Sequence, residues 1–76
     1  MNDFRRKIIG RIQERIEGIK SELEIIRDDE EDAFDNMPES FQYSERGDKM
    51  QECINALDDA ISSMDDVIES LLDACE

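Results

Sequence analysis

Hydrophobic residues recur along two long segments of the chain in alternating steps of three and four. In the first segment these positions are Ile9, Ile12, Ile16, Ile19, Leu23 and Ile26, and the same steps lead on to Glu30 and Ala33. In the second segment they are Met50, Ile54, Leu57, Ile61, Met64, Ile68, Leu71 and Cys75. This spacing is that of the a and d positions of a coiled coil. It predicts two long helices that pack along these seams.

The segment between the two patterns predicts a turn. Pro38 disfavours helical backbone at Met37, so the first helix should end near Asp35. Pro38 also suits the first turn of a short helix that reaches Gln42.

Ser44 is a residue type that caps helix N-termini, and it predicts the start of the second helix. A reciprocal capping box is excluded, because Gly47 stands where Glu or Gln would be needed. We therefore expect one helical-hairpin domain over residues 1–76. Its parts are helix 1 over about 3–35, a loop over about 36–44 and helix 2 over about 45–75.

Charge is divided between the two halves of the chain. Residues 1–27 hold seven bases and five acids, whereas residues 28–76 hold seventeen acids and two bases. A connection this short makes the helices fold back antiparallel. The basic half of helix 1 then lies beside the acidic half of helix 2. We therefore expect an all-α fold, an antiparallel two-helix hairpin that resembles a coiled coil.

One flank of helix 2 is small or apolar, which indicates a second neighbour. A chain of 76 residues buries a modest core alone, and a face this wide suits a four-helix bundle. On helix 1 the corresponding flank carries Phe4, Ile8, Gly18 and Ile25, interrupted by Arg11, Arg15 and Glu22. We expect the hairpin to form a homodimer through helix 2. The predicted oligomer interface is Cys53, Ala56, Ala60, Ser63, Val67, Ser70 and Ala74.

The opposite side of helix 2 carries a candidate partner-binding surface, which we call the acidic face. Its residues are Asp58, Asp59, Asp65, Asp66, Glu69 and Asp73. With a net charge of −13, the chain is attracted to basic protein surfaces and repelled by nucleic acid and anionic membranes. At the turn, Phe41 and Tyr43 either pack under the tip or anchor a partner.

The run of acids from Asp28 to Asp32 admits a calcium-loop interpretation, because oxygen-bearing side chains recur at suitable intervals. However, Ala33 stands where such a loop needs glycine, and the run continues the helical seam. We interpret the run as a solvated helix end. Glu30, an acid at a seam position, indicates either a frayed end or a site kept acidic for a basic partner.

The sequence contains no other motif typical of a catalytic, cofactor or metal site. The chain has no histidine, no nucleophile–base pair and no glycine-rich phosphate loop, so we expect no enzyme, no catalytic residue, no cofactor and no metal. The basic segment from Phe4 to Ile12 could lie on a membrane or bind RNA. We set this aside, because the seam uses its isoleucines and helix 2 supplies acids to neutralise it.

The compartment is indicated by the cysteines and by the absence of a signal sequence. Cys53 and Cys75 on one helix would lie about 33 Å apart, too far for a disulfide. No apolar segment resembles a signal peptide or a membrane span. We therefore expect reduced thiols and a cytoplasmic location, in a bacterium or in a host cell.

The linker from Asp35 to Gly47 reads Asp-Asn-Met-Pro-Glu-Ser-Phe-Gln-Tyr-Ser-Glu-Arg-Gly and is followed by acidic heptads. It resembles a family of small acidic helical proteins of bacteria and phages, in which an N-x-P-E-S-x-Q-x-S-E-R-G linker precedes an acidic helix. The resemblance covers residue 35 to about residue 72. It implies a phage or mobile-element setting and favours an inhibitor of a host system, without implying site residues.

We therefore expect a non-enzymatic, homo-oligomeric protein-interaction module that acts through its acidic surface. One alternative is a nucleic-acid mimic of the anti-restriction or anti-CRISPR type. The rows of acids repeat about every 10.5 Å, which is wider than the phosphate spacing of one strand. Another alternative is a structural or assembly factor.

Overall fold

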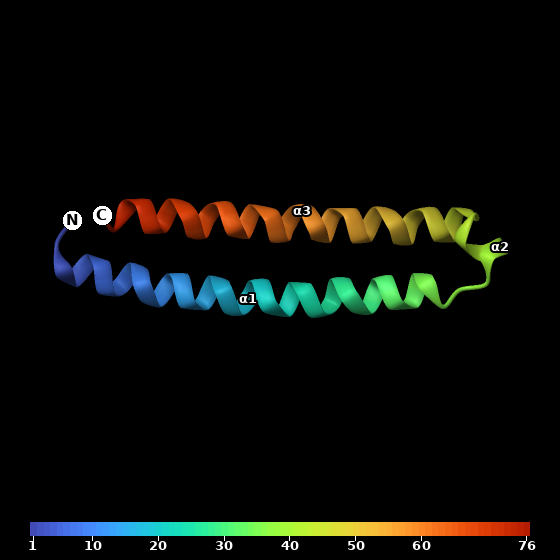
Figure 1. Cartoon of the computed structure of the whole chain (residues 1–76), viewed down its shortest axis with the longest axis horizontal. Helices are drawn as coiled ribbons and strands as arrows, with labels where there is room; N and C mark the ends of the chain where they lie inside the picture. The colour runs from blue at the N-terminus through green and yellow to red at the C-terminus, as the bar shows by residue number, and fades with distance from the viewer.

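Two long helices lie side by side and antiparallel, joined by a short third helix at one end (Figure 1). The computed structural model describes all 76 residues. The elements are α1 (Asp3–Asp35), α2 (Glu39–Gln42) and α3 (Glu45–Ala74). The molecule measures 58 × 15 × 11 Å and contains no strand. The predicted all-helical hairpin is confirmed.

The tip is closed by a close approach of two backbones. The Ser44 side chain caps α3 by accepting a hydrogen bond from the Gly47 backbone N–H at 3.4 Å. Gly47 is buried, and a Cβ at this position would lie 2.1 Å from the carbonyl oxygen of Gln42. The position that lacks the Glu of a capping box is therefore one where only glycine fits.

Gln42, the last residue of α2, ties the tip to the end of α1. Its side-chain amide donates to the carbonyl oxygens of Phe34 at 3.0 Å and Met37 at 3.2 Å. The last carbonyls of a helix have no partner within the helix. The Phe34 carbonyl accepts from the Met37 backbone N–H at 3.1 Å, and the Gln42 amide gives it a second donor from the tip. The tip is thus fixed by hydrogen bonds as well as by Pro38.

The seam of α3 follows the predicted heptads. Ile54 is buried, and the other seven predicted positions are half-buried. All of them lie on the side of α3 that packs against α1. A hairpin leaves each helix with one neighbour, which is why a single hydrophobic side chain reaches full burial.

The seam of α1 differs from the prediction at three of its eight positions. Ile19 and Ile26 are 47% and 54% exposed, whereas Lys20 and Arg27 are half-buried. Likewise Ala33 is exposed and Phe34 is half-buried. The predicted seam positions 19, 26 and 33 are therefore wrong by one residue. In this rotation the cations of α1 reach acids of α3 across the seam, and the larger Phe34 takes the place of Ala33.

The register of the hairpin is given by two of these cross-helix pairs, Lys20 with Asp65 and Arg27 with Asp58. A step of seven along α1 matches a step of seven back along α3. At this register Ile9 is level with Glu76, so the first turns of α1 extend beyond the end of α3 (Figure 1). Phe4 in this overhang is 72% exposed.

Candidate partner-binding surfaces

One side of the hairpin is held by ion pairs. Lys20 Nζ lies 2.6 Å from Asp65 Oδ1 and 3.7 Å from Glu24 Oε1. The hydrogen bond that Lys20 donates to Asp65 raises the pKa of Lys20 above its usual 10.5, and both carboxylates add to the effect by their charge. Lys20 therefore keeps its charge throughout the neutral range.

Arg27 is the centre of a second, larger group on the same side. Its Nε donates to Asp58 Oδ1 at 2.8 Å, and its Nη1 contacts Asp28 at 3.3 Å and also Glu31. The hydrogen bond to Asp58 raises the pKa of Arg27 further. Asp28 and Glu31 lie in the C-terminal half of α1, toward the negative end of the helix dipole, and Asp58 faces them from α3, so the guanidinium offsets repulsion among the three carboxylates.

These pairs divide the predicted acidic face. Asp58 and Asp65 are paired with Arg27 and Lys20 of α1 along the side of the hairpin, although both remain exposed. Asp59, Asp66, Glu69 and Asp73 are exposed and form no ion pair. The first two therefore hold the hairpin together, and only the other four remain free to meet a partner.

A longer line of acids becomes visible once α3 is traced to its start. Glu45, Glu52, Asp59, Asp66 and Asp73 recur at every seventh residue, and all are exposed without an ion pair. We call these five residues the acidic row. Neighbouring members lie about 10.5 Å apart along the helix. The sequence prediction missed its first two members, although the same seven-residue period includes them.

The tip aromatics stay open to solvent. Phe41 is 53% exposed and Tyr43 is 80% exposed. The hydrogen bonds of Gln42 and Ser44 fix the turn without help from these rings. Both rings therefore lie next to the first residue of the acidic row with much of their surface uncovered.

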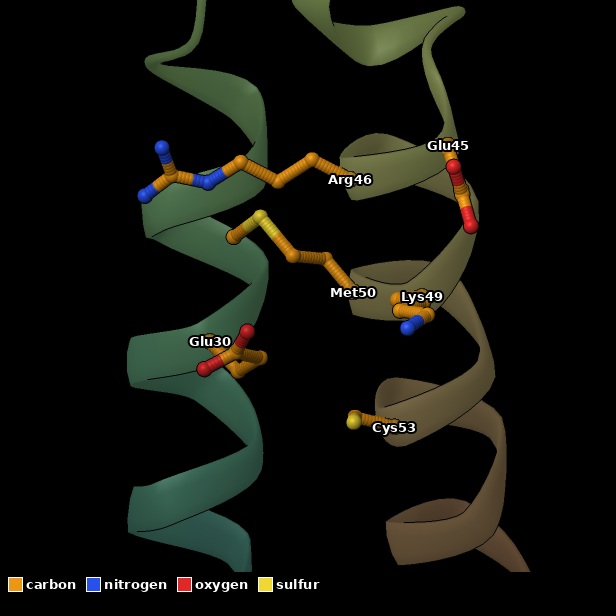
Figure 2. Close-up of a pocket in the computed structure, with 6 residues that line it drawn as sticks. All are labelled: Glu30, Glu45, Arg46, Lys49, Met50 and Cys53. Carbon is orange, nitrogen blue, oxygen red and sulfur yellow. The ribbon is translucent and has the colours of Figure 1, made fainter.

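A shallow groove of about 440 Å³ lies between the helices near the tip. Figure 2 shows the Arg46, Met50 and Cys53 side chains extending from α3 toward α1, with Glu30 of α1 opposite them. Lys49 and Glu45 complete the lining. The half-buried Glu30 has no ion pair or hydrogen bond from a side chain. The groove can hold a long side chain, with an acid available for a cationic end.

The basic residues near the start of α1 are not neutralised by α3, contrary to the sequence interpretation. Arg5, Lys7, Arg11 and Arg15 are exposed and form no ion pair, and Arg6 pairs only with Asp3. The overhang explains part of this, because residues 3–8 of α1 have no part of α3 beside them. The ion pairs with α3 are formed instead by Lys20 and Arg27, nearer the middle of α1.

The side of the hairpin opposite the ion pairs is apolar. On α1, Ile19 and Ile26 each stand one residue before a half-buried cation of the seam, and Ile12 continues the same stripe one heptad earlier. The three isoleucines therefore lie on the side of α1 that faces away from the paired cations. On α3, the same reasoning places Cys53, Ala60, Val67 and Ala74 across the seam from Asp58 and Asp65. The two stripes thus share one face, which we call the apolar face. It includes Ala56, Ser63 and Ser70, so all seven predicted interface residues lie there; six are exposed and Ala60 is half-buried.

Both thiols are free; Cys53 is exposed and Cys75 is half-buried. No group of three or more acidic or thiol side chains is arranged to hold a metal ion. Neither long helix has a stretch apolar enough to cross a membrane. No protein-family model matches the chain, and neither a curated protein nor a solved structure matches it.

Proposed function

We propose that the chain is a non-enzymatic protein-binding module that attaches to a basic protein surface through the acidic row. The observation that supports this most directly is that the row is unpaired. The hairpin uses Asp58 and Asp65 for its own stability and leaves five regularly spaced carboxylates in water. Such charges steer a basic partner and fix its orientation along α3.

The tip gives this surface an apolar end. Phe41 and Tyr43 lie beside Glu45, and exposed aromatics next to polar residues are frequent anchors of protein interfaces. Charge then supplies the approach of the partner, and the rings supply the buried area. The resemblance of the linker to proteins of bacteria and phages favours a partner in a bacterial host, with the chain acting as an inhibitor.

The test compares two variants that lose the same charge. The row variant carries Asp59→Asn, Asp66→Asn and Asp73→Asn. The control carries Glu14→Gln, Glu17→Gln and Asp32→Asn, which are exposed acids of α1 outside the ion pairs. We expect wild type and control to capture the same proteins from a bacterial lysate, and the row variant to lose basic ones.

Ionic strength provides the second arm of this test. Capture that depends on the row should weaken steeply from low to moderate salt, because the charges are exposed and screened. Identical captured proteins for all three chains, or capture indifferent to salt, would refute the role of the row. A chain variant in which Phe41 and Tyr43 are replaced by Ser then reports on the tip alone.

A nucleic-acid mimic is the second candidate function. The five-residue acidic row supports it better than the three members that the sequence prediction included. Five acids in line present a long negative edge on one side of a rod 58 Å long. A mimic must compete with DNA or RNA for its target. If duplex DNA displaces the chain from a captured protein, and the row variant does not compete, the target is a nucleic-acid-binding protein.

A further inference from the structure

We propose that the apolar face is covered by a second copy of this chain, with a two-fold axis along the hairpin. Each α1 then lies against α3 of the other copy, and both tips are at the same end. The acidic row points away from this face and stays free. The proposal therefore concerns a different surface from the proposed function, and the two can fail separately.

The exposed area of the hairpin is that of half a dimer. A compact monomer of 8.8 kDa exposes about 4,800 Å². The hairpin exposes 5729 Å², an excess of roughly 900 Å². Each partner in a standard-size protein interface contributes about 800 Å². The excess is thus what one such interface would remove.

The two stripes of the apolar face fit each other in size. Rotation about the long axis keeps every residue at its own height, so the register inside the hairpin also gives the contacts between copies. Ile19 then lies within one residue of the height of Val67 of the second copy, and Ile26 within one residue of the height of Ala60. Large side chains on α1 meet small or medium side chains on α3, which lets helices approach and interdigitate.

The polar residues that interrupt the α1 stripe also fall opposite suitable neighbours. Arg15 lies level with Ser70 of the second copy, and Glu22 lies level with Ser63. Serine is small, so it leaves room for the long side chain to reach solvent, and its hydroxyl can hydrogen-bond to it. The interruptions therefore do not bury a charge without a partner.

Charge decides between this arrangement and the one with tips at opposite ends. α3 contains nine acids and two bases. Opposed tips would place α3 directly against α3, and would stack small residues on small and isoleucines on isoleucines. With the tips together the two α3 helices are diagonal, which keeps the two most acidic helices apart. Of the unpaired bases of α1, Arg11 and Arg15 lie level with the last turns of α3 of the second copy, whereas Arg5 and Lys7 stay in the overhang.

The first experiment is sedimentation equilibrium. We expect wild type to be a dimer, and the variant Ile19→Glu with Ile26→Glu to be a monomer over the same concentrations. The matched control is Ser21→Glu with Ser62→Glu, which adds two charges at exposed positions away from the apolar face. A control that dimerises beside a variant that does not supports the proposal. A dimeric Ile→Glu variant, or a monomeric wild type, overturns it.

The second experiment needs no disruptive change and measures the orientation. Spin labels are placed at the tip through Ser40→Cys, in a chain with Cys53→Ala and Cys75→Ala. With tips together the two labels lie across a bundle and give a short distance. Opposed tips would separate them by close to the 58 Å length of the molecule. A distance of that length, or no coupling between labels, overturns the proposal.

Salt separates this inference from the proposed function. Two chains of net charge −13 repel each other, so added salt should strengthen the dimer. The same salt should release a basic partner from the acidic row. A wild type that remains monomeric in high salt refutes the dimer and leaves partner capture standing. A dimer without salt-sensitive capture refutes the proposed function alone.

Discussion

Gly47 holds the tip together because it has no side chain. It is the buried residue over which the end of α2 passes, with the Gln42 carbonyl in the space that a Cβ would take. Glycine inside a helix normally weakens it, because glycine loses more conformational freedom on folding than any other residue. Here the same residue permits a contact that larger residues forbid.

We therefore expect Gly47→Ala to lower the free energy of unfolding by about 1–3 kcal/mol, the usual effect of overpacking. Gly18 has nothing within 4 Å of an added Cβ. Gly18→Ala should instead raise the free energy of unfolding by about 0.5–1 kcal/mol. Urea denaturation of both variants at one protein concentration measures the difference. Equal effects of the two changes would contradict the close approach at the tip.

Lys20 gives the fold a dependence on alkaline pH. Its pKa is raised above 10.5 in the folded chain, chiefly by the hydrogen bond that Lys20 donates to Asp65. The stabilisation from this pair is complete below 10.5 and is lost as pH rises through the raised value. Lys20→Arg should keep the pair charged at higher pH.

The measurement is thermal unfolding from neutral pH to pH values above the raised pKa of Lys20. Wild type should lose stability over the alkaline part of this range more than Lys20→Arg does. All other side chains are the same in the two proteins, so the comparison isolates the change at position 20. Parallel loss in both proteins would show that the pair contributes nothing to the pH dependence.

At the scale of the helix, the sequence predicts the seam well where hydrophobic burial alone decides which residues face the other helix. The seam of α3 contains only apolar and sulfur-containing residues, and its predicted positions are the observed ones. The seam of α1 mixes isoleucines with nearby cations, and the heptad pattern counts only the isoleucines. The pattern cannot show that Lys20 and Arg27 gain acids on α3 when α1 rotates. That information lies in the pairing of the helices.

The same limit applies to the candidate surfaces. The six residues of the predicted acidic face look equivalent in the sequence. Only the cross-helix register shows that Asp58 and Asp65 are already paired. Gln42 was likewise missed, because a lone glutamine in a loop has no pattern. Its role depends on where the end of α1 lies in space.

The end of α1 depends on Gln42 more than on its own sequence, since its last turn carries no basic residue. Gln42→Ala should lower the free energy of unfolding by about 1 kcal/mol, because the Met37 carbonyl loses its side-chain donor and the Phe34 carbonyl keeps only the Met37 backbone N–H. Gln51→Ala is the control, since Gln51 is exposed and contacts only Asn55. Hydrogen exchange at the last turn of α1 should speed up in the first variant only.

Glu30 is the acid within the α1 seam, and it tests whether stability has been traded for binding. Glu30→Leu should raise the free energy of unfolding by about 1 kcal/mol, since a leucine there would be half-buried against Met50. Asp29→Leu, at an exposed neighbour, should not. If the Glu30 variant is more stable but captures fewer proteins, the groove belongs to the binding surface. If capture is unchanged, Glu30 serves no partner.

For the molecule as a whole, net charge opposes the fold. Twenty-two acids against nine bases on a rod 11 Å thin repel each other, and the ion pairs relieve only part of this. We expect the melting temperature to rise with added salt. The triple Asp→Asn row variant should melt higher than wild type at low salt and respond less to salt. A melting temperature that falls with salt would show that the ion pairs outweigh the repulsion.

The two ends of the chain lie together at the end of the rod opposite the tip (Figure 1). Anything joined to either end, whether a surface, a bead or another domain, holds the aromatic tip about one molecular length, 58 Å, away from the attachment. In the proposed dimer all four ends would gather at the same place. A short linker between two copies would then turn association into an intramolecular step, so a tandem chain should stay assembled at any dilution.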